Sequence, residues 1–279
     1  ELTPFLITAY FIIMILFSSW CFLKFSKEAA IGIILFSIFI YFGLTNMPWL
    51  PLILIYGLIG FKIGGLKLSL TIVASFLFIT FTGVLPQALL SIYLCGIAVI
   101  ISFILGSSLG IWAAHNDKVS AFMRPINDTM QTMPSFVILI PFVMFFGIGE
   151  FTALLAIIAY AFVPAMRYTE HGLRNLPETV IEAARMIGCS QTQLLWKVKI
   201  PLAMPVIMLG LNQTIMFGLA MLVIAALVGT TGLGQLIYIG LSKADFGTGM
   251  ISGVSIALIA IIFDRTTQAW RIKLEKKTQ

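Results

Sequence analysis

Charged side chains are scarce in this sequence: Asp, Glu, Lys and Arg make up 10% of its 279 residues, whereas 60% are hydrophobic. A soluble domain carries about 25% charged and about 45–50% apolar residues. One globular core could not hide this excess of apolar surface, which excludes an ordinary soluble domain. The fold class expected is therefore all-α, in a polytopic integral membrane protein. The first thirty residues lack a basic n-region and a small-residue cleavage site, so we expect membrane helices there rather than a signal peptide.

Motifs for nucleotide binding, metal binding and catalysis are also missing. No GxxxxGK[ST] run occurs, so the chain has no P-loop to bind ATP phosphates. Cys21, Cys95 and Cys189 are scattered without CxxC spacing, which predicts neither a disulfide framework nor a metal site. His115 and His171 have no Cys or carboxylate neighbours at metal-ligand spacing. We expect no metal, no cofactor and no enzyme active site in this chain.

Ionisable residues are nearly absent from the long apolar runs. Ion-coupled carriers usually keep an Asp, Glu, His or Arg within a span, so this scarcity disfavours such a carrier. Asp264 lies at a helix end beside Arg265, and we expect a local ion pair there. The net charge of +6 is not taken as a sign of nucleic-acid binding. Cytoplasmic loops of membrane proteins collect Lys and Arg, and lipid is the expected surrounding.

Hydropathy predicts about nine transmembrane helices, because a span needs about 20 mostly apolar residues. With the N-terminus outside and the C-terminus inside, Lys243 is the single external member of the 17 Lys and Arg residues. That asymmetry is what the positive-inside rule requires. The expected spans are 4–24, 29–45, 48–61, 66–84, 88–114, 133–149, 151–167, 203–228 and 248–264.

A polar loop over 168–201 interrupts the apolar pattern. Pro177 is compatible with a helix start, and Gly188 can end that helix in a left-handed cap. Ser190 followed by Gln193 is a capping-box pattern, which predicts a second short helix through Trp196. An apolar face of the first helix is expected from Val180, Ile181, Ala184 and Ile187. The pair of helices could float on lipid, but small residues beside Gly188 favour docking of another protein.

The same loop resembles the EAA motif of ABC importer permeases, in which Glu-Ala-Ala is followed at fixed spacing by Gly and Pro. That resemblance implies a coupling helix that enters a cleft of a cytoplasmic ATPase subunit. Val198 and Ile200 are apolar substitutions at the Ile and Leu positions of the motif. The matching residues, which we assign to ATPase coupling, are Glu182, Ala183, Ala184, Gly188 and Pro201.

Residues 84–270 resemble the permeases for glycine betaine, proline betaine and choline. The resemblance is carried by the runs RPINDTMQTMPSFVILIPFVMFFGIG, FVPAMRYTEHGLRNLP, PLAMPVIMLGLNQTIMFGLAMLVIAALVG and IALIAIIFDRTTQ. It implies a type I ABC importer permease fold in the bacterial inner membrane and uptake of a quaternary-amine osmolyte by ATP-driven alternating access. A permease for another small solute, such as an amino acid or taurine, and an ion-coupled secondary carrier remain alternatives.

The resemblance also implies partners and a domain organisation. Expected partners are a cytoplasmic ATPase dimer, which would hold the ATP and Mg, a second permease subunit in a homodimer, and a substrate-binding protein. Nucleic acid is not an expected partner. The expected division is N-terminal accessory helices over 1–83, the permease core over 84–267 and a basic tail over 268–279.

Polar residues inside or beside the spans are candidates for the translocation pathway. Gln131 and Thr132 precede Pro134, which ends or kinks a helix. Gln213, Thr214 and Met216 lie in the middle of a span. Contacts between helices are the alternative role for such residues.

Overall fold

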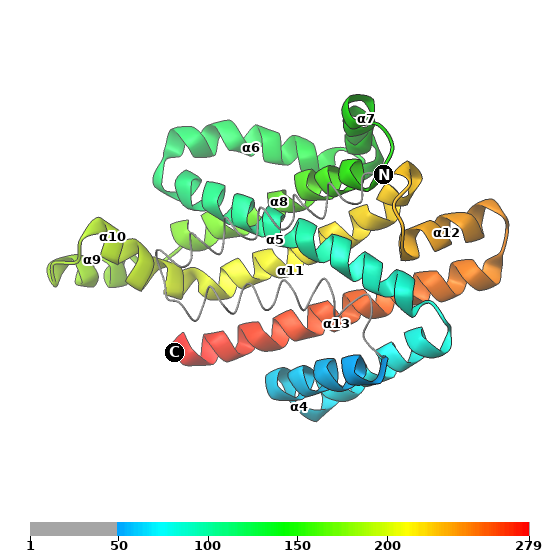
Figure 1. Ribbon diagram of the computed structural model, residues 1–279. Helices are drawn as coiled ribbons and strands as arrows, with labels where there is room; N and C mark the ends of the chain where they lie inside the picture. The colour runs from blue at the N-terminus through cyan, green and yellow to red at the C-terminus, as the bar shows by residue number, and fades with distance from the viewer. Residues whose placement is uncertain (1–48, 279) are drawn as a thin grey trace, which may run out of the picture. The chain divides into compact units, whose positions relative to one another are not determined.

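The computed structural model describes residues 49–278. Two expected spans, 4–24 and 29–45, lie outside the described residues. The chain divides into two compact units, one up to Leu52 and the other from Ile53 onward. The helices are α4 (Trp49–Phe81), α5 (Leu85–His115), α6 (Asp117–Thr132), α7 (Ser135–Phe146), α8 (Glu150–Arg174), α9 (Glu178–Met186), α10 (Gln191–Gln193), a π-helix (Leu194–Lys199), α11 (Ile200–Ala225), a 3-10 turn (Ala226–Val228), α12 (Leu233–Ser242) and α13 (Phe246–Thr278) (Figure 1).

Helices make up the secondary structure of the described part, as the sequence predicts for this fold class. Five of them are long and apolar enough to cross a membrane, and α6 with α7 adds a sixth if this pair, bent by 103°, counts as one span. The expected count of about nine is thus approximate. Two of the nine lie outside the described residues, and α4 (Trp49–Phe81) covers most of two more, the expected spans 48–61 and 66–84.

The long helix α4 is a hairpin rather than one straight rod. Gly65 breaks it with φ 76° and ψ −166°. The hydroxyl of Ser69 donates to the carbonyl of Gly57 at 2.9 Å, and the rings of Tyr56 and Phe76 lie 5.2 Å apart. In a straight helix residues twenty positions apart would be about 30 Å apart. Each arm has about 16 residues and a length of about 24 Å, which is less than the thickness of about 30 Å of a bilayer core.

Helices α5 and α8 pack with their backbones in close contact. A Cβ atom built at Gly106 would lie 2.5 Å from the carbonyl oxygen of Phe162, and one at Gly110 would lie 2.6 Å from that of Met166. Small residues four positions apart allow such an approach in membranes, where van der Waals contact is a main attraction between helices. The buried core continues from α8 into α11, through Ile157 and Met221.

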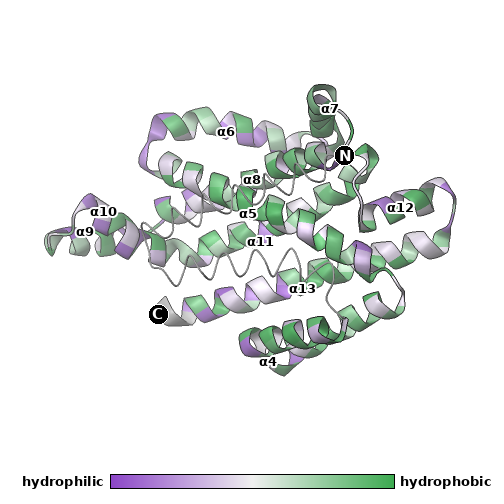
Figure 2. Cartoon of the chain, in the orientation of Figure 1, coloured by the Kyte–Doolittle hydropathy of each residue, from purple (hydrophilic) through white to green (hydrophobic). Residues whose placement is uncertain are grey.

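Several basic residues lie at the same end of the helix bundle. Arg174, at the end of α8, donates to the carbonyl of Ala113 near the end of α5. Lys273, near the end of α13, donates to the carbonyl of Lys62 in the α4 turn. Helices α9 and α10 lie at this same end, and α12 with Lys243 lies at the other (Figure 1). Hydrophilic colour is concentrated along α6, at α9–α10 and on the last part of α13 (Figure 2).

The connection from α12 to α13 is fixed by Asp245. Its carboxylate accepts the backbone N–H of Thr248 at 3.2 Å and the Thr248 hydroxyl at 2.7 Å. The hydroxyl bond is the main reason why the pKa of Asp245 is lowered, since it stabilises the charged form. This carboxylate therefore caps the first turn of α13.

Candidate functional site

The loop between α8 and α11 has the turn that its glycine predicts. Gly188 adopts φ 88° directly after α9. Its N–H donates to the carbonyl of Arg185 at 2.9 Å, and the N–H of Cys189 donates to that of Ala184 at 3.2 Å. These two bonds form a Schellman motif, which satisfies carbonyl groups that the helix end leaves free. The left-handed cap is confirmed.

The capping box is also confirmed, but the helix that follows differs from the prediction. The Ser190 hydroxyl accepts the N–H of Gln193 at 3.3 Å, and the Gln193 side chain accepts the N–H of Ser190 at 3.0 Å. The predicted short helix through Trp196 is wrong as a separate element. The chain continues as the π-helix Leu194–Lys199 directly into α11, where Pro201 is in the first turn. Each hydrogen-bonded turn of a π-helix contains one more residue than an α turn, and the chain stays helical from Gln191 into α11.

The surface of the loop is apolar at its tip. Ala184 is buried, as is Leu194 in the π-helix that packs against α9. Glu182 and Ala183 are exposed. Of the predicted apolar face, Val180 is 39% and Ile187 84% exposed, and Met186 beside Ile187 is 90% exposed. Two large apolar side chains at a protruding tip favour a protein partner, because contact with water is unfavourable for them and burial against another protein removes it.

Arg174 connects the start of the loop to two other helices. Its guanidinium contacts Asp117 of α6 at 2.8 Å, Glu170 of α8 at 3.0 Å and the carbonyl of Ala113 of α5 at 2.7 Å. Glu170 is buried and also accepts the hydroxyl of Ser120 at 2.5 Å. Arg174 thus links the start of the loop to both α5 and α6. Sequence reasoning did not find this cluster, because Glu170 and Arg174 of α8 are 50 or more positions away from Ser120 and Asp117 of α6.

Two pathway candidates lie at the end of α6, beside a pair of opposite charges. Arg167 of α8 donates to the side chains of both Gln131 and Asp128. Thr132 is exposed, and its hydroxyl donates to the carbonyl of Asp128 at 2.9 Å. The chain then turns by 103° at Pro134 into α7. The structure thus brings Gln131 and Thr132 together with a charged pair that hydropathy did not reveal.

The other three candidates lie on α11 and differ in their surroundings. Thr214 is fully buried, and its hydroxyl donates to the carbonyl of Gly210 at 2.8 Å within the helix. Met216 packs against the apolar core. Gln213 is half-buried, and its side chain makes no hydrogen bond with another described residue. Among these three, Gln213 has the polar group that is free to meet a solute.

Asp264 forms hydrogen bonds with residues of both α11 and α13. The predicted ion pair between Asp264 and Arg265 is wrong. Its carboxylate accepts from Asn212 of α11 at 2.9 Å and from Gln268 at 2.7 Å. Thr267 donates to the Asn212 side chain at 2.6 Å. Asp264 faces α11 while Arg265 is exposed, because successive residues of a helix point about 100° apart. This network joins α11 to α13.

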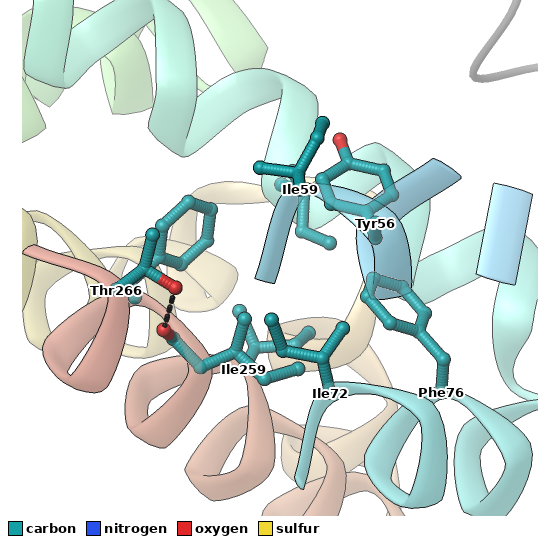
Figure 3. A pocket seen from close by; sticks show the side chains of 9 residues that line it. Tyr56, Ile59, Ile72, Phe76, Ile259 and Thr266 are labelled. Atoms are coloured by element: carbon teal, nitrogen blue, oxygen red, sulfur yellow. Dashed lines mark hydrogen bonds between the residues drawn. The ribbon is translucent and has the colours of Figure 1, made fainter. Parts of the chain in front are cut away.

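An apolar cavity of about 90 Å³ lies between the α4 hairpin, α5 and α13. Figure 3 shows Tyr56, Ile59, Ile72, Phe76, Ile259 and Thr266 around it. The Thr266 hydroxyl donates to the carbonyl of Ile262, so it is not free for a ligand. Such a lining offers no charge partner to a polar solute. Among the described residues, no group of three His, Cys, Asp or Glu is placed to hold a metal ion.

Residues 103–270 match the family described as binding-protein-dependent transport system inner membrane component. The chain is 40% identical over 226 residues to the glycine betaine/proline betaine transport system permease protein ProW of Escherichia coli, covering 81% of this chain and 64% of that protein. It is 36% identical over 237 residues to the glycine betaine transport system permease protein OpuAB of Bacillus subtilis, covering 85% and 83%.

Two further comparisons concern a longer relative and a solved structure. The trimethylamine N-oxide transport system permease protein TmoV of Pelagibacter ubique is 42% identical over 226 residues, which are 81% of this chain and 31% of that protein. An inward-facing structure of the MetNI methionine ABC transporter superposes with a TM-score of 0.60 and 18% identity, covering 68% of this chain and 95% of the matched chain. This likeness supports the expected type I permease fold.

Proposed function

We propose a function for this chain on the basis of its family. The chain belongs to the binding-protein-dependent transport system inner membrane components. It is the membrane-spanning permease subunit of an ABC importer in a bacterial cytoplasmic membrane. The family match supports the class of transport protein, and the long apolar helices fit a protein that crosses the membrane several times. The chemistry of ATP hydrolysis belongs to a separate subunit that holds ATP and Mg.

The observation that carries the proposal is the loop 178–199. The loop exposes Glu182 and Ala183, and it has an apolar tip at Met186 and Ile187. It lies at the end of the bundle where the basic residues gather. We place this end in the cytoplasm, with the C-terminus inside and the N-terminus outside, because basic residues stay on the inner side. There the loop meets the ATPase, and Glu182, Ala183, Ala184, Gly188 and Pro201 form the coupling element.

The transported solute is a quaternary-amine osmolyte such as glycine betaine, choline or carnitine. The names of the relatives support this class, since they include glycine betaine and trimethylamine N-oxide permeases. A separate or fused binding protein delivers the solute. Two copies of this chain pair around the pathway, each serving one ATPase of a dimer. The core over 84–267 carries these functions, with accessory helices in 1–83 and a tail over 268–279.

Transport then follows from movement of the loop. Closure of the ATPases on ATP displaces α9, and Arg174 passes the displacement to α5 and α6 through Ala113 and Asp117. Helix α6 joins α7 at a bend of 103°. A movement of the loop that displaces α6 therefore changes this bend. The pathway opens outward to receive the solute, and hydrolysis returns it to the inward-facing state.

Uptake by the reconstituted complex tests the proposal. The permease, its ATPase and its binding protein are placed in liposomes loaded with ATP, and entry of radiolabelled glycine betaine, choline and carnitine is measured. We expect uptake of at least one of them to depend on both ATP and the ATPase. Uptake driven by an ion gradient without the ATPase would support a secondary carrier, and uptake of an amino acid or taurine instead would assign another solute.

A further inference from the structure

We propose that Arg167 and Asp128 form a transient binding site for a zwitterionic solute in the inner half of the pathway. The two side chains form an ion pair between α8 and α6, and Gln131 is the second acceptor of the Arg167 guanidinium. The inference rests on the proposed function, which supplies the class of solute. It adds a site on this chain that the family match does not assign.

The position of the pair calls for water around it. Arg167 lies seven residues before Arg174, so it is about 10 Å from the inner end of α8. Helix α8 has 25 residues and is about 37 Å long, which exceeds the bilayer core of about 30 Å, so Arg167, the last residue of the expected span 151–167, lies near the inner boundary of that core. The side chains of Arg167 and Asp128 are 41% and 59% exposed. Charged side chains at this boundary face water or another protein chain rather than lipid.

The surface of α6 has a polar stripe that continues from this pair. Arg124, Asp128 and Thr132 are spaced four residues apart and are all exposed, so they lie along one side of the helix. Large apolar side chains, including Phe122 at 70% exposed, occupy another side. A helix with one polar and one apolar side in a membrane separates water from lipid. The stripe therefore lines the aqueous part of the pathway.

The chemistry of the pair matches a zwitterion that carries a carboxylate and a quaternary ammonium group. The solute carboxylate can replace that of Asp128 on the Arg167 guanidinium, where a two-pronged contact is favourable. The freed Asp128 carboxylate then faces the ammonium group. The number of charges of each sign in contact is unchanged, so neither group is left unpaired.

The same exchange explains why the site would release its solute. When the site is empty, Arg167 is already satisfied by Asp128 and Gln131. Binding must separate an existing ion pair, so the net gain is small. A transporter needs such weak binding, because a solute that is held tightly leaves slowly. A cation without a carboxylate offers the Arg167 guanidinium no replacement for Asp128, which favours zwitterions such as glycine betaine and carnitine over choline at this step.

Protection from cysteine labelling tests the site. The natural Cys21, Cys95 and Cys189 are replaced by alanine, and Thr132→Cys is introduced next to the pair. Inside-out membrane vesicles without ATP are treated with a sulfonated methanethiosulfonate, with or without glycine betaine. We expect labelling in its absence and, at about ten times the half-protecting concentration, labelling that is about tenfold slower, since the rate follows the unoccupied fraction. Sucrose of equal osmolality is the solvent control.

Matched variants separate the site from a general effect. Lys118→Cys, near the inner end of α6, should be labelled at the same rate with and without glycine betaine. Arg167→Gln and Asp128→Asn should each abolish protection of T132C, Arg167→Lys should keep part of it, and Arg271→Gln, in the ion pair with Glu275, should keep all of it. Melting of each variant at the wild-type temperature shows that the variant still folds.

Three outcomes would overturn the site: no labelling of T132C, labelling that glycine betaine leaves unchanged, or protection that survives in both R167Q and D128N. The uptake experiment above fails or succeeds independently of these. A permease that takes up glycine betaine but shows no protection at T132C keeps the proposed function and loses the site. Absence of glycine betaine uptake with an intact ATPase would instead remove the proposed function.

Discussion

The amide of Cys189 donates to the carbonyl oxygen of Ala184 across the turn at the tip of the loop, at 3.2 Å. The bond closes only if the residue between the helix end and Cys189 is left-handed, and Gly188 supplies this conformation at φ 88°. The geometry of the coupling loop thus depends on a residue that has no side chain to contact a partner. This relation leads to the first prediction.

Replacing Gly188 with valine should distort the turn and reduce uptake about tenfold or more. No atom lies within 4 Å of the position of an added Cβ, so the cost is conformational rather than steric. A left-handed residue with a Cβ costs about 1–2 kcal/mol, and each 1.4 kcal/mol is about tenfold in the docked population. Gly253→Ala, in a helix and equally uncrowded, is the control and should transport normally. Uptake by G188V at the wild-type level would contradict the docking role of this turn.

Neighbouring alanines in the loop should respond differently to a charge. Ala183→Glu places the carboxylate on the exposed side of α9, so the chain should keep its thermal stability and lose the ATPase in a pull-down. Ala184→Glu buries a charge beneath the π-helix, and we expect this variant to lose stability as well. Melting of the purified chain and co-purification of the ATPase are measured together. Retention of the ATPase by A183E would place the docking surface elsewhere.

Arg174→Gln should destabilise the chain by about 1.5–3 kcal/mol, the range for hydrogen bonds to charged groups. Glu170 would remain buried without its positive partner. The double variant with Glu170→Gln should recover part of the loss, because the stranded charge is removed. Arg265→Gln, at an exposed position of α13, should change stability by less than about 0.5 kcal/mol.

The R174Q variant also tests whether Arg174 transmits movement of the loop to α5 and α6. R174Q should keep ATP hydrolysis in the complex while its uptake falls, giving a lower number of solute molecules per ATP. Equal losses of hydrolysis and uptake would indicate that Arg174 serves stability alone. Thermal melting, ATPase rate and uptake of one preparation distinguish these results.

Replacing Gly110 with leucine should separate α5 from α8 and cost about 1–3 kcal/mol, as overpacking does. The added Cβ would lie 2.6 Å from the carbonyl oxygen of Met166, and backbone cannot move aside as a flexible side chain can. Gly96→Ala in the same helix meets no atom within 4 Å and is the control. Thermal unfolding of the two purified variants is the measurement. Equal melting temperatures would show that the close approach of these helices contributes little.

The sequence by itself determined the features that depend on nearby residues. Hydropathy set the helices, and the bias of Lys and Arg towards one end followed from the connections between them. The turn at Gly188 and the capping box at Ser190 were also predictable, since their bonds join residues three to five positions apart. The α4 hairpin was visible as two separate apolar runs, of which 48–61 is already shorter than the about 20 residues that a span needs.

Tertiary structure decided which polar residues meet. Gln131 and Thr132 were chosen for their place before a proline, but their charged neighbours Arg167 and Asp128 come together across 39 positions of sequence. Thr214 and Gln213 are adjacent in the chain, yet one is fully buried and the other half-exposed. The physical reason is rotation of each helix about its axis, which packing between helices fixes. A local pattern of residues contains no information on the side that a neighbouring helix will cover.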